Sequence, residues 1–123
     1  MSEEKEKIVY ILTYAGENPE RATFPFLLAN AAQAMDVEAV VALQGTAVYL
    51  AKKGYAKHIS VPGLTPLKDL MDSFIKNGGK LLVCIPCIEG RMIEQGDLIE
   101  GAELAKAGKL IDEITSAKGT LVY

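Results

Sequence analysis

The sequence predicts a single-domain α/β fold with a mostly parallel β-sheet. Apolar segments typical of buried strands alternate with segments of helical periodicity. The chain has 123 residues, and 50% of them are hydrophobic, so one domain can bury its own core. Strands that alternate with helices are joined by crossovers, which produce parallel sheets. We therefore expect one domain over residues 1–123, with 1–6 as a flexible end.

Six segments are expected to be strands. Three of them are continuous apolar runs, as is typical of strands covered on both faces. The others are shorter or less apolar. In chain order the predicted strands are 8–13, 37–43, 58–61, 80–84, 102–104 and 119–123.

The predicted helices begin at residues suited to a first turn. Asn18-Pro19 and Thr65-Pro66 each pair a capping side chain with a proline, and Thr46 is expected to cap a short helix that stops at Gly54. Pro25 either lies within the first helix or starts its main body, and both readings stay open. Two later helices are expected at about 86–94 and at 107–117. The first helix is expected to bury Phe24, Leu27, Leu28, Ala31, Ala32 and Met35, which recur at helical spacing.

Two cysteines, Cys84 and Cys87, stand where a predicted strand gives way to a helix. Ligands of parallel α/β sheets bind at the carboxyl ends of strands. A helix start offers free N–H groups and partial positive charge, which are expected to favour thiolate over thiol. With C-x-x-C spacing, one thiolate can attack and the other can resolve a mixed disulfide. Arg91, four residues past Cys87, can add positive potential on the same helix face.

Four more residues are candidates for a pocket at this edge of the sheet. Tyr14 and Asn18 follow the first strand, and Gln44 and Gly45 follow the second. The chain has no G-x-G-x-x-G and no P-loop, so we expect no bound nucleotide and no other cofactor. Two cysteines and one histidine are too few for a zinc site within one chain, so no metal is expected, although a site shared between subunits stays open.

Charge and hydropathy restrict the partners. The net charge is −3, with 13 basic against 16 acidic residues, which disfavours nucleic acid as a ligand. No apolar run approaches the ~20 residues of a membrane helix, and the charged start lacks the apolar stretch of a signal peptide. We therefore expect no membrane contact and a cytoplasmic protein, in a compartment where thiols stay reduced.

Several segments together resemble the DsrE/DsrF-like family of sulfur-relay proteins. They are the opening strand, the loop 13–21, the Ala-rich first helix, the segment 81–84 and the ending 119–123. The resemblance implies a flavodoxin-like three-layer fold and a homo-oligomer, usually a trimer or hexamer. It also implies that Cys84 carries a persulfide between donor and acceptor proteins, with Arg91 as the family's basic residue. Cys87 departs from the one-cysteine members, and two-cysteine relatives are often labelled peroxiredoxins or thiol oxidoreductases.

Three functions remain open at this point. The first is a persulfide carrier, with possible sulfurtransferase activity. The second is a thiol–disulfide or peroxide-reducing oxidoreductase that uses Cys84 and Cys87 as a pair. The third is a binding or assembly subunit with inert cysteines, since free cysteine often behaves as a small buried hydrophobe.

Overall fold

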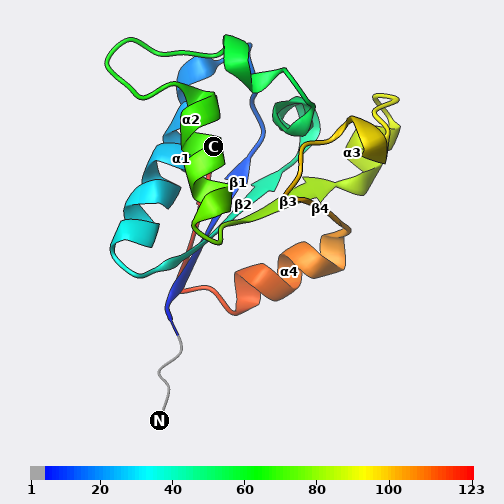
Figure 1. Cartoon of the computed structure of the whole chain (residues 1–123). Coiled ribbons are helices and arrows are strands. Elements are labelled where there is room, and N and C mark those ends of the chain that lie inside the picture. The colour runs from blue at the N-terminus through cyan, green and yellow to red at the C-terminus, as the bar shows by residue number, and fades with distance from the viewer. Residues whose placement is uncertain (1–4) are drawn as a thin grey trace.

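The computed structural model describes residues 5–123 and contains a five-stranded sheet in which every strand pair is parallel (Figure 1). The strand order is β4-β3-β2-β1-β5. The predicted α/β class is confirmed. Of the end predicted to be flexible, residues 1–4 lie outside the described part of the chain. The strands are β1 (Lys7–Leu12), β2 (Glu38–Leu43), β3 (Lys80–Cys84), β4 (Ala102–Ala105) and β5 (Gly119–Val122).

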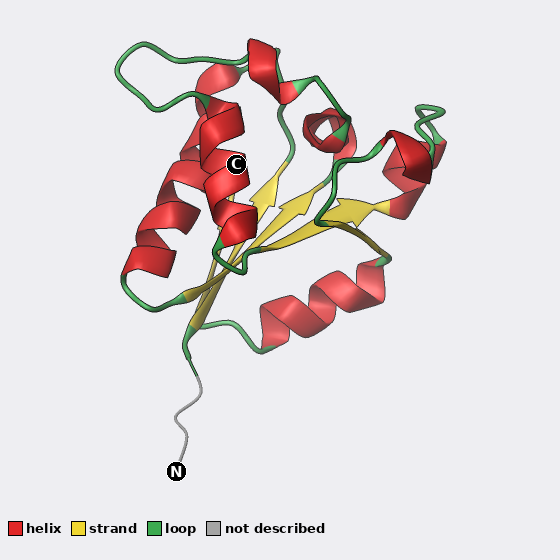
Figure 2. Cartoon of the chain, viewed as in Figure 1, coloured by secondary structure: helices red, strands yellow, loops and turns green. Residues whose placement is uncertain are grey.

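Helices cover both faces of the sheet and form the outer layers (Figure 2). Helices α1 (Pro19–Ala34) and α2 (Leu67–Lys76) lie on one face, and α4 (Ala107–Thr115) lies on the other. The short helix α3 (Ile85–Glu89) follows β3 directly. Three 3₁₀ segments complete the fold: η1 (Gly45–Ala51), η2 (Ala56–His58) and η3 (Gln95–Asp97).

Each face of the sheet has its own apolar cluster, as expected when side chains alternate along strands. Leu81 and Val83 of β3 belong to the cluster under α1 and α2, whereas Leu82 belongs to the cluster under α4. In the first cluster the rings of Phe26 and Phe74 pack edge to face, with their centroids 5.6 Å apart. Both rings are fully buried, so this aromatic pair joins α1 to α2 at the centre of the core.

The predicted buried face of α1 is wrong in part. The side chain of Asn18 caps the helix as expected, with Oδ1 accepting from the Arg21 N–H at 3.1 Å. However, Phe24 and Leu28 are each 37% exposed and Met35 is 76% exposed. The helix is apolar on nearly all sides, so spacing alone does not select the inner face. The residues that α1 buries are Ala22, Thr23, Pro25, Phe26, Ala29 and Ala32, which also places Pro25 within the helix.

Two predicted elements between β2 and α2 are also wrong. Thr46 caps no helix, because the segment forms the 3₁₀ turn η1, which follows Gln44 and has no side-chain cap. Residues 58–61 form no strand. Ile59 is instead buried in the cluster under α1 and α2, and its carbonyl accepts from the Leu67 N–H at 3.3 Å. A segment held over one face of the sheet cannot also pair at its edge.

Helix α3 ends earlier than predicted, at Glu89 rather than near residue 94. The chain turns at Met92, which has a φ of +55°. This turn returns the Ile93 N–H to the Ile88 carbonyl at 2.9 Å and buries both isoleucine side chains. Burial of Ile93 therefore decides where the helix stops.

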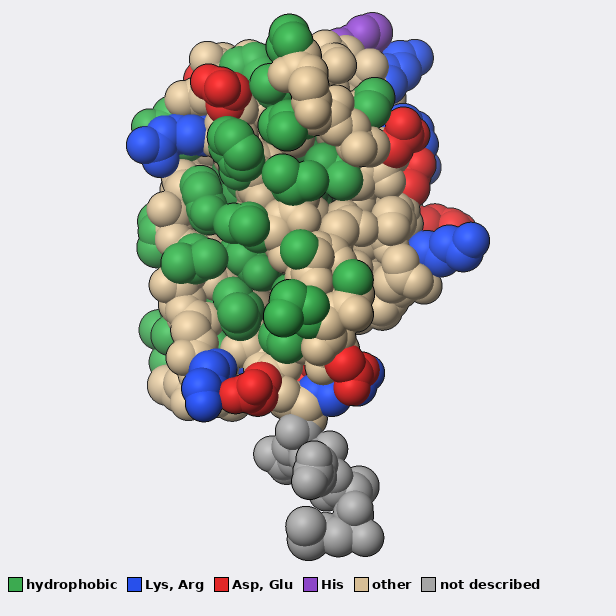
Figure 3. All heavy atoms as spheres, turned by 90° about the vertical axis from the view of Figure 1, so that its left-hand side faces the viewer, with side chains coloured by type: hydrophobic (Ala, Val, Ile, Leu, Met, Phe, Trp, Pro, Cys, Tyr) green, Lys and Arg blue, Asp and Glu red, His purple; other side chains and the backbone are tan. Residues whose placement is uncertain are grey.

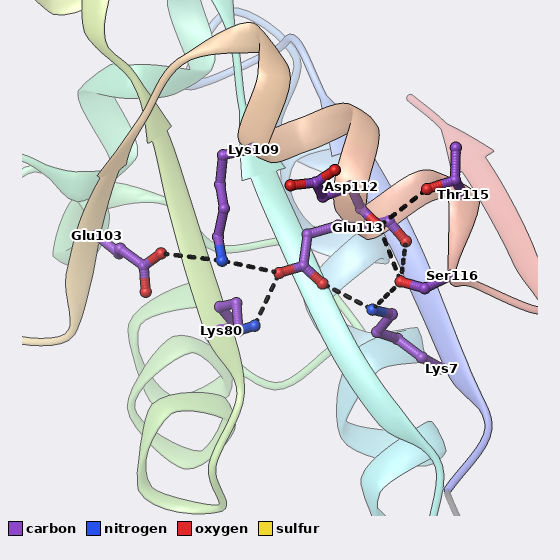
Figure 4. A network of polar contacts seen from close by, with 8 residues as sticks. All are labelled: Lys7, Lys80, Glu103, Lys109, Asp112, Glu113, Thr115 and Ser116. Atoms are coloured by element: carbon purple, nitrogen blue, oxygen red, sulfur yellow. Dashed lines mark hydrogen bonds and ion pairs between the residues drawn. The ribbon is translucent and has the colours of Figure 1, made fainter.

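A buried carboxylate fixes α4 to the amino ends of two strands (Figure 4). Glu113 is only 4% exposed. It accepts from Lys7 Nζ at 2.8 Å and from Lys80 Nζ at 2.7 Å, and Lys109 Nζ lies 3.5 Å away. Burial alone raises the pKa of this carboxyl, but the hydrogen bonds from the two strand lysines outweigh it, and the pKa falls to about 2.

Apolar side chains gather on the side of the molecule where α1 lies (Figure 3). Besides those of α1, large exposed apolar side chains occur on the edge strand β5, at Leu121 and Val122. Contiguous exposed apolar surface is uncommon on monomers and often marks an interaction site. Within residues 5–123, none of the helices combines the length and apolarity needed to cross a bilayer.

Candidate functional site

Cys84 is the last residue of β3, at the carboxyl edge of the sheet. Its backbone is still extended, with φ −63° and ψ 119°, and the next residue begins α3. Pro86 at the second helical position suits this junction, since its missing N–H is not needed there. The strand-to-helix junction predicted from the sequence is therefore present, and Cys84 lies at the point where the chain changes from one element to the other.

Cys87 is the third residue of α3 and faces the turn that follows β2. Its Sγ accepts a hydrogen bond from the Gly45 N–H at 3.3 Å. The Cys87 carbonyl accepts from Arg91 Nη1 at 3.1 Å, which holds the guanidinium beside α3. The structure thus brings Gly45, Cys87 and Arg91 together, three of the residues proposed from the sequence. Both cysteines are free thiols and both are half-buried.

The environment of Cys84 does not favour its thiolate in the way the sequence suggested. Burial raises the pKa of the Cys84 thiol above 9.0, and the neighbouring Cys87 side chain raises it further. The positive charge of Arg91 lowers this pKa but does not reverse the shift. The backbone N–H of Cys87, at the start of α3, also lowers the pKa of Cys84, as expected for a helix start, but burial and the Cys87 side chain outweigh it. The expectation that the pKa of Cys84 falls below its ordinary value is therefore wrong.

A cavity of about 100 Å³ opens beside Cys84 on the face covered by α4. This volume is several times the ~15 Å³ that one water molecule needs. Most of the wall is apolar, from residues such as Leu82 and Leu110, and Gln44 and Lys106 supply its polar side chains. Such a wall suits a small, polarizable group with one charge or hydrogen-bonding end.

Of the other candidate pocket residues, one lies beside Cys84 and two lie at the start of α1. Gln44 lines the cavity with Cys84, as the sequence analysis proposed. Tyr14 and Asn18 make their contacts at the start of α1 instead. The Arg21 guanidinium lies 5.5 Å from the centroid of the Tyr14 ring, and Asn18 caps the helix.

Lys106 is the site residue that the sequence analysis missed. It follows β4 directly, and β4 pairs with β3 so that Ala105 lies opposite Cys84. The rule that placed the cysteines at the carboxyl edge also applies to the residue after β4, so this signal was present in the sequence. Within residues 5–123, no three His, Cys, Asp or Glu side chains gather as a metal site would require.

The fold and this edge define a class of protein: a parallel α/β domain with two free thiols at the junction between a central strand and a short helix. The comparison with family profiles is more specific. Residues 6–123 match the DsrE/DsrF-like family, so the chain belongs to that family.

Related sequences occur in methanogenic archaea. MJ0989 of Methanocaldococcus jannaschii is an uncharacterized protein that is 31% identical over 117 residues, which cover 95% of this chain and 99% of that protein. MK0008 of Methanopyrus kandleri, also uncharacterized, is 27% identical and covers 94% of this chain and 93% of its own length. A third relative, MJ0760 of M. jannaschii, is 28% identical over 110 residues, and the chain spans only 40% of its length.

Two solved structures share the fold. The ychN protein of E. coli superposes with a TM-score of 0.80 at 22% identity, covering 96% of this chain and 99% of that one. MTH1491 of Methanobacterium thermoautotrophicum, described as a protein of unknown function, gives a TM-score of 0.69 at 13% identity, covering 97% and 100%. At these identities the likeness establishes the architecture, including the sheet edge on which the thiols lie.

Proposed function

We propose that this protein is a sulfur carrier that holds a persulfide on Cys84. The observation that carries the proposal is the position of Cys84: it ends a central strand and lines a small apolar cavity. The outer sulfur of a persulfide is compact and polarizable, which suits such a wall. Membership of the DsrE/DsrF-like family supports a role connected with sulfur relay.

The loading step is an exchange at sulfur. The Cys84 thiolate attacks the outer sulfur of a donor persulfide, R–S–SH, and a new S–S bond forms at Cys84 Sγ. The S–S bond of the donor breaks, and the donor leaves as the thiolate R–S⁻. The outer sulfur is transferred from the donor to Cys84 without net oxidation or reduction, so the step needs no redox cofactor.

Cys87 offers a route for unloading. Its thiolate can attack Cys84 Sγ, which expels the outer sulfur as HS⁻ and leaves a Cys84–Cys87 disulfide. The hydrogen bond from the Gly45 N–H holds the Cys87 sulfur beside the turn that follows β2. An external dithiol must then reduce the disulfide before the next cycle. In direct relay, a thiol of the acceptor protein attacks the outer sulfur of the Cys84 persulfide instead.

Intact-protein mass spectrometry after incubation with a persulfide donor tests the proposal. We expect the Cys87→Ser variant to gain the mass of one sulfur atom and to keep it. The wild type should gain it and then lose it together with two hydrogens as the disulfide forms. The Cys84→Ser variant, matched in size and retaining one thiol, should gain none. If Cys84→Ser loads as well as Cys87→Ser, the carrier assignment to Cys84 is wrong.

A second candidate function is dithiol redox chemistry, favoured by the proximity of the two thiols. The Cys87 side chain is close enough to raise the pKa of Cys84. Treatment with mild peroxide would then remove two hydrogens from the wild type and from neither single variant, without any added sulfur. That outcome, combined with no persulfide loading, would replace the carrier proposal.

We further propose that the protein acts as a homo-oligomer, a trimer or hexamer, and exchanges sulfur with donor and acceptor proteins in the cytoplasm. The exposed apolar side chains of α1 and β5 support an interface between copies. Light scattering coupled to size exclusion should give three or six times the mass of one chain. Leu28→Ser should lower that mass, whereas Ile111→Ser on α4, also exposed, serves as the matched control. A monomeric wild type contradicts this proposal.

A further inference from the structure

A second and larger cavity lies away from the cysteines. It measures about 350 Å³ and lies between α2 and the segment 50–57, with residues 99 and 100 closing one side. This volume falls within the range of small-molecule sites, which is about 300–1,000 Å³. Neither Cys84 nor Cys87 contributes to its lining. The cavity is therefore separate from the thiol site and needs its own explanation.

The lining is apolar at the centre. Met71 and Ile75 of α2 face Leu50 and Ile99 across the cavity. Leu50 and Met71 also belong to the buried core, so this wall is held by the fold itself. Ile75 and Ile99 are half-buried, so the apolar body of a ligand can remove their remaining exposed surface from water.

The rim is basic. Lysines approach from both sides: Lys52 and Lys57 on one wall, and Lys68 and Lys76 on α2. Lys68 is neutralised by Asp72 at 2.6 Å. Within residues 5–123, Lys52, Lys57 and Lys76 form no ion pair, and the one other acid of the lining is Glu100. Although the chain has a net charge of −3, the lining of this cavity carries more lysines than acidic residues.

We propose that this cavity binds a small organic anion. The apolar body of the ligand lies over Met71, Ile75 and Ile99, and its carboxylate, sulfonate or phosphate lies between the lysines of the two walls. Apolar burial supplies affinity, and the lysines select for charge. The proposal does not depend on the sulfur chemistry of Cys84, because the two sites share no lining residue.

Amide NMR spectroscopy with a matched pair of probes tests the proposal. Naphthalenesulfonate and naphthol share an apolar body, and only the sulfonate is charged at neutral pH. We expect saturable shifts at the amides of Leu50, Ile75 and Ile99, with the sulfonate binding at least about fivefold more tightly than naphthol. Raising the salt from about 0.01 M to about 0.15 M should remove most of that preference.

Two double variants distinguish the effect of the rim lysines on binding from the effect of the protein's net charge. Lys52→Gln/Lys57→Gln should weaken binding of the sulfonate by about fivefold or more. Lys5→Gln/Lys118→Gln carries the same change in charge at exposed ion pairs elsewhere and should change the affinity less than about twofold. Superposable amide spectra of both variants show that each is folded.

Three results would overturn the proposal. The first is equal affinity for the two probes, and the second is equal weakening by the two double variants. The third is the absence of saturable shifts at these amides up to about 1 mM probe. Shifts confined to α1 and β5 would count as the third result, because the sulfonate would then be binding the exposed apolar face.

Discussion

The Gly45 N–H donates to Sγ of Cys87 at 3.3 Å, across 42 residues of sequence. This contact depends on the backbone of Gly45, whose φ of +56° lies in the left-handed region that glycine adopts without strain. The turn after β2 therefore helps to position the second thiol, and its geometry can be perturbed without touching either cysteine.

Gly45→Ala should lower the free energy of unfolding by about 1 kcal/mol, because a Cβ is unfavourable at this φ. No heavy atom lies within 4 Å of the position of that Cβ, so the cost comes from the backbone alone. Gly108→Ala is the matched control: it adds a Cβ in open space within α4 and should stabilise by about 0.5 kcal/mol. Urea denaturation measures both, and a shift of the same sign in the two variants contradicts the prediction.

Arg91→Ala should make Cys84 slower to alkylate. The guanidinium lowers the pKa of the Cys84 thiol against the effects of burial and Cys87. Its removal should therefore move the midpoint of the pH–rate profile with iodoacetamide upward. The measurement uses the Cys87→Ser background, so that one thiol reacts.

Two controls accompany the Arg91 experiment. Arg91→Lys keeps the charge and should leave the midpoint near its starting value. Arg21→Ala removes a cation that lies over Tyr14 and should have no effect on Cys84. A downward shift in Arg91→Ala would show that Arg91 does not favour the thiolate.

Glu113→Gln should cost about 2–3 kcal/mol of unfolding free energy at neutral pH, since it breaks a buried ion cluster. The folded pKa of Glu113, about 2, lies below its ordinary value of 4.5, so the unfolded chain takes up the proton first as the pH falls. The stabilisation is present above about pH 4.5 and is lost as the pH falls toward 2. The wild type and the variant should therefore converge in stability over that window.

The control for Glu113 is another acid of the same cluster. The Glu103 carboxylate lies 3.9 Å from Lys109 Nζ and is exposed, so Glu103→Gln should cost less than about 0.5 kcal/mol. Urea denaturation at several pH values measures both variants. A constant difference between the wild type and Glu113→Gln from neutral to acid pH would be inconsistent with the lowered pKa.

Phe26→Ala should destabilise the protein by about 3–5 kcal/mol, because it leaves a cavity against Phe74. Phe24→Ala, two residues earlier and 37% exposed, should cost less than about 1 kcal/mol in the monomer. Thermal unfolding of the two variants tests which face of α1 is buried. Similar losses from both would support the face expected from the sequence rather than the observed one.

The sequence was informative where local chemistry was unambiguous. The apolar runs of β1, β2 and β3 predicted a parallel sheet, and Asn18-Pro19 predicted the start of α1. The junction after β3 placed the thiols at the carboxyl edge. Each of these signals depends on a few neighbouring residues, so tertiary contacts do not change the element that it predicts.

Where packing decides between alternatives, the sequence was insufficient. Helix α1 is apolar on nearly all sides, so contacts with α2 and the sheet select its buried face. Burial of Ile93 shortens α3, and burial of Ile59 prevents a strand at 58–61. The position of Lys106 after a predicted strand placed it at the carboxyl edge of the sheet, but the sequence does not show which strand lies beside β3. Lys106 becomes a site residue only because β4 pairs with β3.

Lys80 and Cys84 begin and end β3, so the Glu113 cluster and the thiols lie about 13 Å apart along one strand. The Glu113 carboxyl and the Cys84 thiol also differ widely in pKa. The pKa of the Glu113 carboxyl falls to about 2, whereas burial raises the pKa of the Cys84 thiol above its ordinary value. The Glu113 carboxylate therefore keeps its charge throughout the range in which the Cys84 thiol ionises. Protonation of Glu113, which would loosen α4, thus makes no contribution to a thiol rate profile recorded in alkaline solution.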